Sequence, residues 1–133
     1  MKLWQKTSTS KQEVEQFTVG NDPLFDILLA PYDVLGSMAH ATMLCSIGLV
    51  SQKENELLQK GLKEIFEEIR AGKFEIETGV EDVHSQVEVL LTRRYGEVGK
   101  KLHSGRSRND QVLVDLKLFY REEIRDIVRE IRA

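Results

Sequence analysis

The sequence predicts an all-α protein, in which a helical amino-terminal domain runs into the first long helix of a bundle. Apolar residues recur at steps of three and four residues in several segments, which is the spacing of one helix face. Capping residues and glycines bracket these segments as helix starts and stops. Only residues 74–79 alternate weakly between apolar and polar, and we expect them to be extended or a loop.

The first part of the chain predicts a short helix and a long one. Ser10, with an acidic residue three positions later, caps a helix that ends near Thr18, and residues 20–23 form a turn. Residues 24–49 are apolar on nearly every side, which is typical of a helix buried among others. Pro31 interrupts this segment, so we expect a kink or a break just before it.

The second part predicts three further helices. Ser51 opens the most regular one with a capping box, and Gly72 ends it. Asp82 caps the next helix, which ends at Gly96. The last helix carries an apolar stripe formed by Leu113, Leu116, Tyr120, Ile124, Ile127 and Ile131. Because this stripe continues to the final residue and needs a partner, we expect a helical domain over residues 1–110 and the truncated start of a bundle helix over residues 111–133.

Composition excludes several classes of protein. The 133 residues carry a formal net charge of −3, whereas a nucleic-acid-binding domain is usually basic. We expect no signal peptide and no membrane segment, because no stretch reaches the ~18 apolar residues that a membrane span needs. The one cysteine, Cys45, lies among apolar residues and predicts a buried thiol in a reducing compartment. These features predict a cytoplasmic protein.

The most informative segment is residues 99–111, GKKLHSGRSRNDQ, which lies directly ahead of the last helical pattern. The first backbone N–H groups of a helix have no partner within it, and together with the helix dipole they attract carboxylates and phosphates. The forked guanidinium groups of Arg106 and Arg108 match a carboxylate in a two-bond geometry. Further side chains suited to bonding ligand oxygens are Ser104, Ser107 and Asn109. The segment therefore predicts an anion site.

The histidines call for separate interpretations. His84 and Glu88 lie one helical turn apart, but a third ligand at a recognisable distance is missing, so we expect no metal site. His40 lies inside the apolar run and is predicted to be a core histidine. His103 precedes the serines and arginines of this segment, where it either donates to the ligand or braces the turn. Residues 99–101 lack the surrounding pattern of a P-loop, which argues against nucleotide binding.

Four segments together carry a resemblance to a known family. Residues 103–111, HSGRSRNDQ, look like a first signature region, and residues 81–85, EDVHS, are similar to a Glu-Asp-Ile-His-Thr segment. Residues 25–40 resemble a first long helix and residues 2–4 an amino terminus. The order and spacing of these segments resemble the argininosuccinate lyase family, within the fumarase/aspartase superfamily, over nearly the whole chain.

The chain also departs from that family. Members normally run several times longer, and two later signatures are missing here: a Thr-His pair and a flexible loop followed by Met-Pro-x-Lys-x-Asn. We therefore interpret the chain as an amino-terminal segment. Gly20 stands where the family usually has a substrate-binding serine, so a backbone N–H would have to replace the hydroxyl. Residues 5–7, QKT, stand where the family usually reads Gly-Gly-Arg-Phe.

The resemblance implies β-elimination of argininosuccinate to arginine and fumarate by a homotetramer, with no metal or organic cofactor. Within this chain Ser107, Arg108 and Asn109 would bind the substrate carboxylates. No catalytic base is expected in this segment, because the base and the flexible loop would come from the missing part and from other subunits. Residues expected to lie in the pocket or to support it are Gly20, Asp82, His84, His103, Ser104 and Arg106.

Two alternatives stay open at the level of sequence. Another lyase of the superfamily, of the adenylosuccinate or fumarate class, needs similar dianion recognition but reads differently over residues 103–111. The chain is alternatively a non-catalytic anion-binding or assembly module. The Thr-His and Met-Pro-x-Lys-x-Asn signatures in a longer sequence would favour the enzyme.

Overall fold

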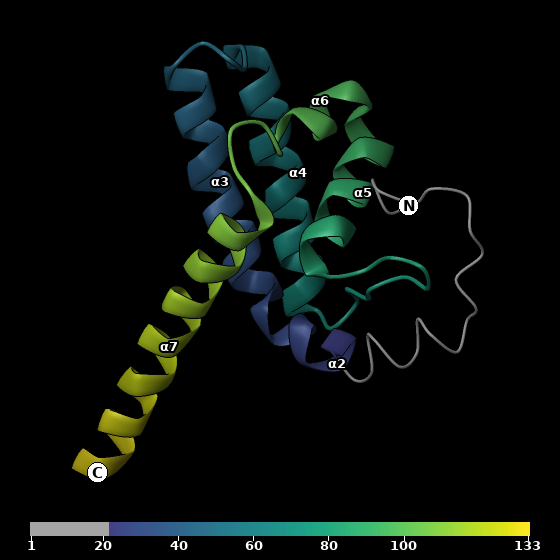
Figure 1. Cartoon of the computed structure of the whole chain (residues 1–133). Helices are drawn as coiled ribbons and strands as arrows, with labels where there is room; N and C mark the ends of the chain where they lie inside the picture. The colour runs from purple at the N-terminus through teal and green to yellow at the C-terminus, as the bar shows by residue number, and fades with distance from the viewer. Residues whose placement is uncertain (1–21) are drawn as a thin grey trace.

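The computed structural model describes residues 22–133 (Figure 1). The expected cap at Ser10, the helix ending near Thr18 and the site residue Gly20 lie outside the described residues. The described part is built from the following elements: α2 (Asp22–Asp26), the 3-10 turn η1 (Ile27–Leu29), α3 (Ala30–Ser46), α4 (Gln52–Arg70), α5 (Val83–Tyr95), α6 (Glu97–Lys101) and α7 (Arg108–Arg132). Since residues 22–133 contain no strand, the all-α prediction is confirmed for them.

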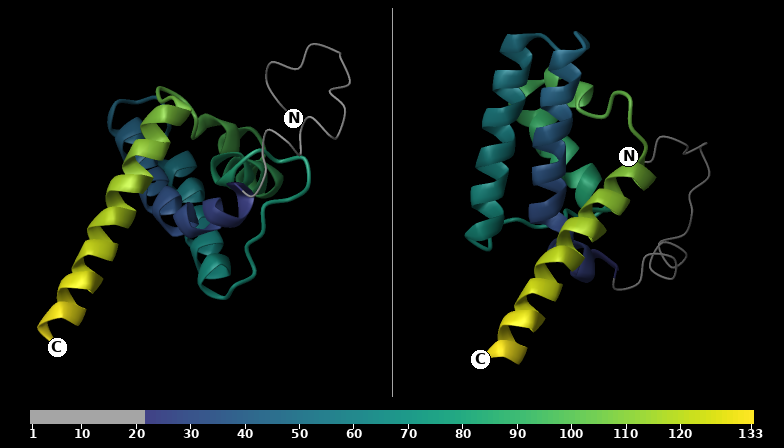
Figure 2. Two further views of the ribbon diagram at one scale, coloured as in Figure 1. Left: turned by 60° about the horizontal axis from the view of Figure 1, so that its bottom comes forward. Right: turned by 90° about the vertical axis from the view of Figure 1, so that its left-hand side faces the viewer.

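The helices form a compact group from which one helix extends. Helices α3 and α4 lie side by side, α5 packs against α4, and the short α6 folds back onto α5 (Figure 1). Helix α7 crosses α3 near its start and then runs beyond the other helices, as both views in Figure 2 show. The buried apolar core consists of Ala30, Val34, Ala41, Leu44, Val50, Leu58, Leu62, Ile65, Phe74, Val83, Val87, Leu91 and Leu102.

The predicted helix starts and stops are largely confirmed. The 3-10 turn η1 lies just before Pro31, where we expected a kink or a break. Ser51 forms the predicted capping box with Glu54, and its hydroxyl accepts from the Glu54 N–H. The Asp82 carboxylate accepts from the Ser85 N–H at 2.8 Å and so caps α5. Residues 74–78 form a loop, as one of the two readings predicted.

The segment around residues 97–108 is more helical than predicted. Helix α6 occupies Glu97–Lys101, part of which we expected to be loop. Helix α7 begins at Arg108, because Ser107 caps it in a second capping box with Asp110. The loop is therefore confined to residues 102–107, and Arg108 and Asn109 belong to the first turn of a helix.

The apolar run in the first half of the chain corrects one expectation. By length and composition alone, Leu24–Ser46 is apolar enough to cross a membrane, with a mean hydropathy of 1.2, although we expected no such stretch. The core helix of a soluble protein passes the same test. Here the segment packs against α4 and α7 and buries Asp33 and Ser37, so it behaves as a core helix. Cys45 is only partly buried, rather than buried as expected.

Helix α7 contacts the rest of the molecule through a mixed polar and aromatic face. The Tyr32 hydroxyl donates to Glu122 at 2.9 Å, and the Tyr32 ring meets Phe119 edge-on with centroids 5.8 Å apart. Two polar residues of α7, Gln111 and Asp115, are buried against the helical group. The apolar stripe predicted from the sequence points away from it. Its exposed members include Leu113, Tyr120, Ile124, Ile127 and Ile131.

The chain is expected to self-associate at tens of micromolar, because an exposed apolar stripe of this length is typical of an interface. Sedimentation should show species larger than a monomer. Ile124→Asp should weaken this association without loss of helical content, since Ile124 is 60% exposed in the single chain. A stable monomer in which α7 is protected from amide exchange would contradict the prediction.

Candidate functional site

A cleft of about 300 Å³ lies between the start of α5, the loop over residues 102–107 and the start of α7. Its lining residues are His84, Ser85, Val87, Glu88, Leu102, His103, Arg106, Arg108 and Gln111. Two arginines and two histidines thus face one cavity, opposed by the carboxylate of Glu88. Four of the residues predicted from sequence meet here: His84, His103, Arg106 and Arg108. The cleft is therefore a candidate anion site.

Arg108 is held at the edge of the cleft by the segment that precedes α5. Its Nε lies 2.9 Å from Asp82 Oδ2 and its Nη1 lies 3.0 Å from Glu81 Oε1, while Nη2 donates to the Ser85 hydroxyl at 3.4 Å. A guanidinium carries five N–H groups, so both terminal nitrogens keep a further donor for a ligand. Asp82, which the sequence placed near the pocket, orients Arg108 and caps α5.

The other residues predicted to bind substrate have different surroundings. The Ser107 hydroxyl accepts from the Asp110 N–H and donates to Asp110 Oδ2, so it serves as the cap of α7. Asn109 is exposed in the first turn of α7. The Ser104 carbonyl lies 2.8 Å from Nε2 of His40. His40 is half-buried rather than buried in the core, and its contact with Ser104 links the loop over residues 102–107 to α3.

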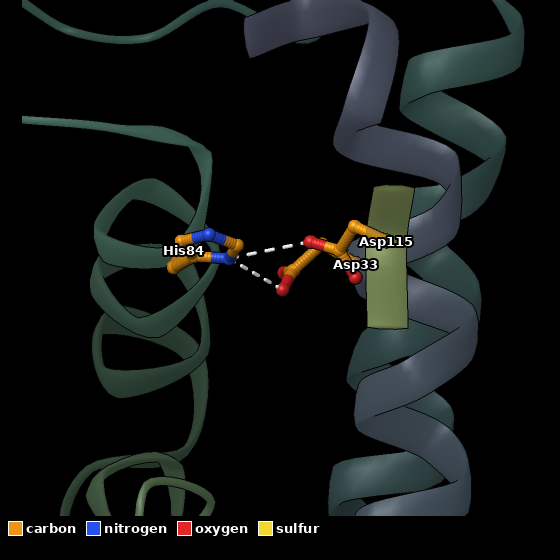
Figure 3. Close-up of side chains that lie close together, drawn as sticks. All are labelled: Asp33, His84 and Asp115. Atoms are coloured by element: carbon orange, nitrogen blue, oxygen red, sulfur yellow. Dashed lines mark hydrogen bonds and ion pairs between the residues drawn. The ribbon is translucent and has the colours of Figure 1, made fainter. Parts of the chain in front are cut away.

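Behind the cleft lies a buried polar cluster that joins three helices (Figure 3). Nδ1 of His84, on α5, lies 2.7 Å from Oδ1 of Asp33, on α3, and 3.6 Å from Oδ2 of Asp115, on α7. Both aspartates are only 1% exposed and His84 is 8% exposed. Gln111 donates to Asp33 at 3.4 Å. The cluster therefore couples the floor of the cleft to α3 and α7.

A close helix crossing brings these side chains together. A Cβ built at Gly36 would lie 3.2 Å from Cγ1 of Val114 and 3.7 Å from Oδ1 of Asp115, so the glycine lets α7 approach α3. Arg106 reaches the same region from the loop and donates through Nη2 to the Ser37 hydroxyl at 3.1 Å. Oδ2 of Asp33, Oδ2 of Asp115 and Nε of Arg106 are buried without a hydrogen-bond partner among the described residues.

The cluster shifts the proton affinity of its members. Burial, together with the negative charge of Asp33, raises the pKa of Asp115 to about 7. For His84, burial acts to lower the pKa, but the hydrogen bond and charge of Asp33, aided by Asp82 and Asp115, outweigh it and raise the pKa. Burial lowers the pKa of Arg106 from its ordinary value. Asp115 and His84 therefore bind their protons more tightly in the fold than they would as isolated groups.

Sequence reasoning missed the aspartates of this cluster and their polar neighbours. The sequence does contain a signal, because these polar residues occur in pairs four positions apart. Asp33 and Ser37 lie in the apolar run, and Gln111 and Asp115 lie in the last helix. Four residues make about one helical turn, so each pair lies on one helix face. The convergence of these two faces on His84 comes from tertiary packing.

The same three side chains present donor atoms within 4.8 Å of one another, which is close enough for a metal ion. Two carboxylates and an imidazole are ordinary ligands for a divalent cation. However, the positive charge of Arg106 acts on both aspartates, and Nδ1 of His84 is already bonded to Asp33. This charge balance favours a proton-holding network over a cation site.

Replacing Asp115 with asparagine is expected to stabilise the fold at about pH 8 and to change it little at about pH 4. The pKa of Asp115 is about 7 in the fold against an ordinary value of 3.8, so its proton stabilises the folded state at low pH. That contribution is lost as the pH rises through about 7. Asparagine keeps the shape without the titration, with a gain of about 1–3 kcal/mol.

Urea denaturation of both chains across this pH range tests the effect, with Asp126→Asn as the control. Asp126 is a partly exposed aspartate of α7 whose side chain pairs with Arg129. A difference between Asp115→Asn and the unchanged chain that stays constant with pH would show that Asp115 does not titrate in this range.

The all-α fold agrees with the comparison with known families. Residues 2–133 match a family described as Lyase, and the chain belongs to this lyase family. Proteins named argininosuccinate lyase are its relatives. The one from Bacteroides thetaiotaomicron is 59% identical over 130 residues, which cover 98% of this chain and 29% of that protein. The one from Thermotoga neapolitana is 42% identical over 134 residues, covering 98% of this chain and 34% of that protein.

A further relative, from Phocaeicola vulgatus, is 58% identical over 130 residues and is also named argininosuccinate lyase. The chain spans about 29% of the length of this relative and of the one from Bacteroides thetaiotaomicron. The resemblance read from the sequence is thus confirmed. The matched segment corresponds to less than a third of each of these two proteins.

Proposed function

We propose that this chain supplies part of the substrate-binding site of an argininosuccinate lyase, which cleaves argininosuccinate to arginine and fumarate by β-elimination. The observation that carries the proposal is the cleft in which Arg106, Arg108, His84 and His103 converge beside the start of α7. Two guanidinium groups and two imidazole rings suit a substrate with several carboxylates. The names of the relatives supply the particular substrate.

The start of α7 adds backbone donors to the cationic side chains. Ser107 Oγ accepts from the Asp110 N–H, so helix geometry leaves the N–H groups of Arg108 and Asn109 for a ligand. The positive end of the helix dipole acts in the same direction. We propose that Ser107, Arg108 and Asn109 together hold a substrate carboxylate, with Ser107 acting through the cap that sets the helix start.

Binding of this kind also assists the chemistry. In β-elimination a base removes a proton next to a carboxylate, and negative charge accumulates on that carboxylate before the leaving group departs. Fixed donors that meet this charge lower the barrier, because they need no reorganisation during the reaction. We propose that the base lies outside this segment, that subunits assemble as a homotetramer in the cytoplasm, and that no metal or organic cofactor takes part.

The chain by itself is expected to bind fumarate without releasing it from argininosuccinate. General acid–base groups typically contribute ~10²–10⁴-fold to a rate, and the proposal places the base elsewhere. Chemical-shift changes on adding fumarate should include the backbone N–H groups of Arg108 and Asn109. Turnover of argininosuccinate in proportion to the amount of chain would contradict the placement of the base, and fumarate shifts confined to residues outside the cleft would contradict the site.

A further inference from the structure

The contact between Asp33 and His84 has a geometry that points to a role in the cleft. The 2.7 Å contact uses Nδ1 of His84. His84 also lines the cleft, so Nε2 is the ring nitrogen left to meet a ligand there. In Figure 3 the His84 ring extends from α5 toward the two aspartates, and dashed lines join one ring nitrogen to both carboxylates. The Asp33 carboxylate thus fixes the orientation of the ring and accepts from Nδ1–H, so Nε2 carries an outward N–H when the ring is charged.

We propose that Asp33 is a positioning residue, which holds His84 through Nδ1 so that His84 presents a cationic Nε2–H to a carboxylate in the cleft. This inference rests on the proposed function, because it specifies how the same cleft recognises its anion. A carboxylate behind a histidine is a recurrent arrangement for fixing the tautomer and stabilising the imidazolium. Asp33 itself is 1% exposed and does not line the 300 Å³ cleft, so it acts through His84.

The surroundings of His84 favour its charged form. Asp33 on α3 and Asp115 on α7 face its Nδ1 side, and Asp82 at the start of α5 adds negative charge. The other charged or titratable groups around it are Asp26 on α2 and Glu88, His103, Arg106 and Arg108 around the cleft. The positive charge of Arg106 balances the charge of both aspartates. Asp33 makes the only hydrogen bond to the His84 ring among the described residues, so its charge has the most direct effect.

Titration of the histidines tests the positioning role directly. The chain contains three histidines, His40, His84 and His103, so single substitutions assign each ring resonance. Asp33→Asn keeps an oxygen that accepts from Nδ1 but removes the negative charge. We expect it to lower the pKa of His84 by about one unit or more, with the other two histidines changed far less. An unchanged His84 titration in a folded Asp33→Asn chain would overturn the proposal.

A double-substitution cycle in the lyase that contains this chain tests whether Asp33 acts through His84. Near neutral pH, Asp33→Asn should lower kcat/KM by roughly five- to tenfold, and lowering the pH by about one unit should restore most of it. In a His84→Asn background the same change should have little further effect. Asp126→Asn, on the distal part of α7, serves as the matched control with kcat/KM unchanged. Equal losses from Asp33→Asn in both backgrounds would assign Asp33 a purely structural role and overturn the proposal.

The two measurements separate this inference from the proposed function. If fumarate fails to bind the cleft at all, the proposed function fails, whereas the His84 titration still reports whether Asp33 controls that ring. If fumarate binds in a manner independent of pH and of Asp33→Asn, the anion site stands and the positioning role is wrong.

Discussion

Replacing Arg108 with lysine is expected to lower kcat/KM of the proposed argininosuccinate lyase by roughly 10- to 1,000-fold, equivalent to about 1–4 kcal/mol of transition-state binding. Lysine keeps the positive charge but has no fork. It cannot contact Asp82, Glu81 and Ser85 together, as Arg108 does, and still offer two parallel donors to a ligand. The denaturation midpoint should change much less than kcat/KM, because the Arg108 side chain is 39% exposed and its ion pairs are partly screened.

Arg93→Lys provides a matched control for this change. Arg93 also pairs with a carboxylate through two nitrogens, at 2.5 and 2.7 Å from Glu77, but it lies outside the cleft. Arg93→Lys should therefore leave kcat/KM nearly unchanged.

Asn109→Ala is expected to lower kcat/KM in the same range as Arg108→Lys, since it removes a ligand donor at an exposed position. Near-normal kcat/KM for both Arg108→Lys and Asn109→Ala would make residues 102–109 a structural turn.

Leu62→Ala is expected to destabilise the fold by about 2–5 kcal/mol, with kcat/KM per folded molecule retained. Leu62 lies in the middle of α4 with no exposed surface, packed in the core that α3, α4 and α5 share. Truncation removes favourable burial and leaves a cavity that the surrounding helices fill only in part. Urea denaturation with a shared slope for both proteins gives the free energy difference.

Leu57→Ala is the control for the effect of burial. Leu57 lies on the same helix and is 40% exposed, so its truncation should cost much less than that of Leu62. Equal losses at Leu57 and Leu62 would show that helix propensity, rather than core packing, determines the effect. That outcome would contradict the assignment of the core.

Helix boundaries followed from the sequence wherever the signal was local. Ser51 with Glu54, Asp82, and Pro31 each act on backbone groups within four residues of themselves, so their effect needs no knowledge of the rest of the chain. The anion loop was found on the same basis. His103, Arg106 and Arg108 line the cleft because they lie on one short segment that leads into α7, while His84 faces the same cleft from α5.

Helix α6 was missed because Gly99 suggested a loop. Glycine has a low helix propensity, and this local argument is sound in isolation. In the fold, a Cβ at Gly99 would lie 2.5 Å from the backbone N of Thr92, so the glycine is needed for the close packing of α6 on α5. A requirement for contact with another helix thus overrode the local preference.

The sequence by itself determined the helical class, most of the helix ends, the anion loop and the apolar stripe of α7. Only the tertiary structure decided which face of α7 packs on α3, and it chose the polar face with Gln111 and Asp115. It also brought Asp33, His84 and Asp115 together from positions far apart in the chain. Local signals act through the backbone over a few residues, whereas this cluster depends on a helix crossing that Gly36 permits and on burial that no single segment provides.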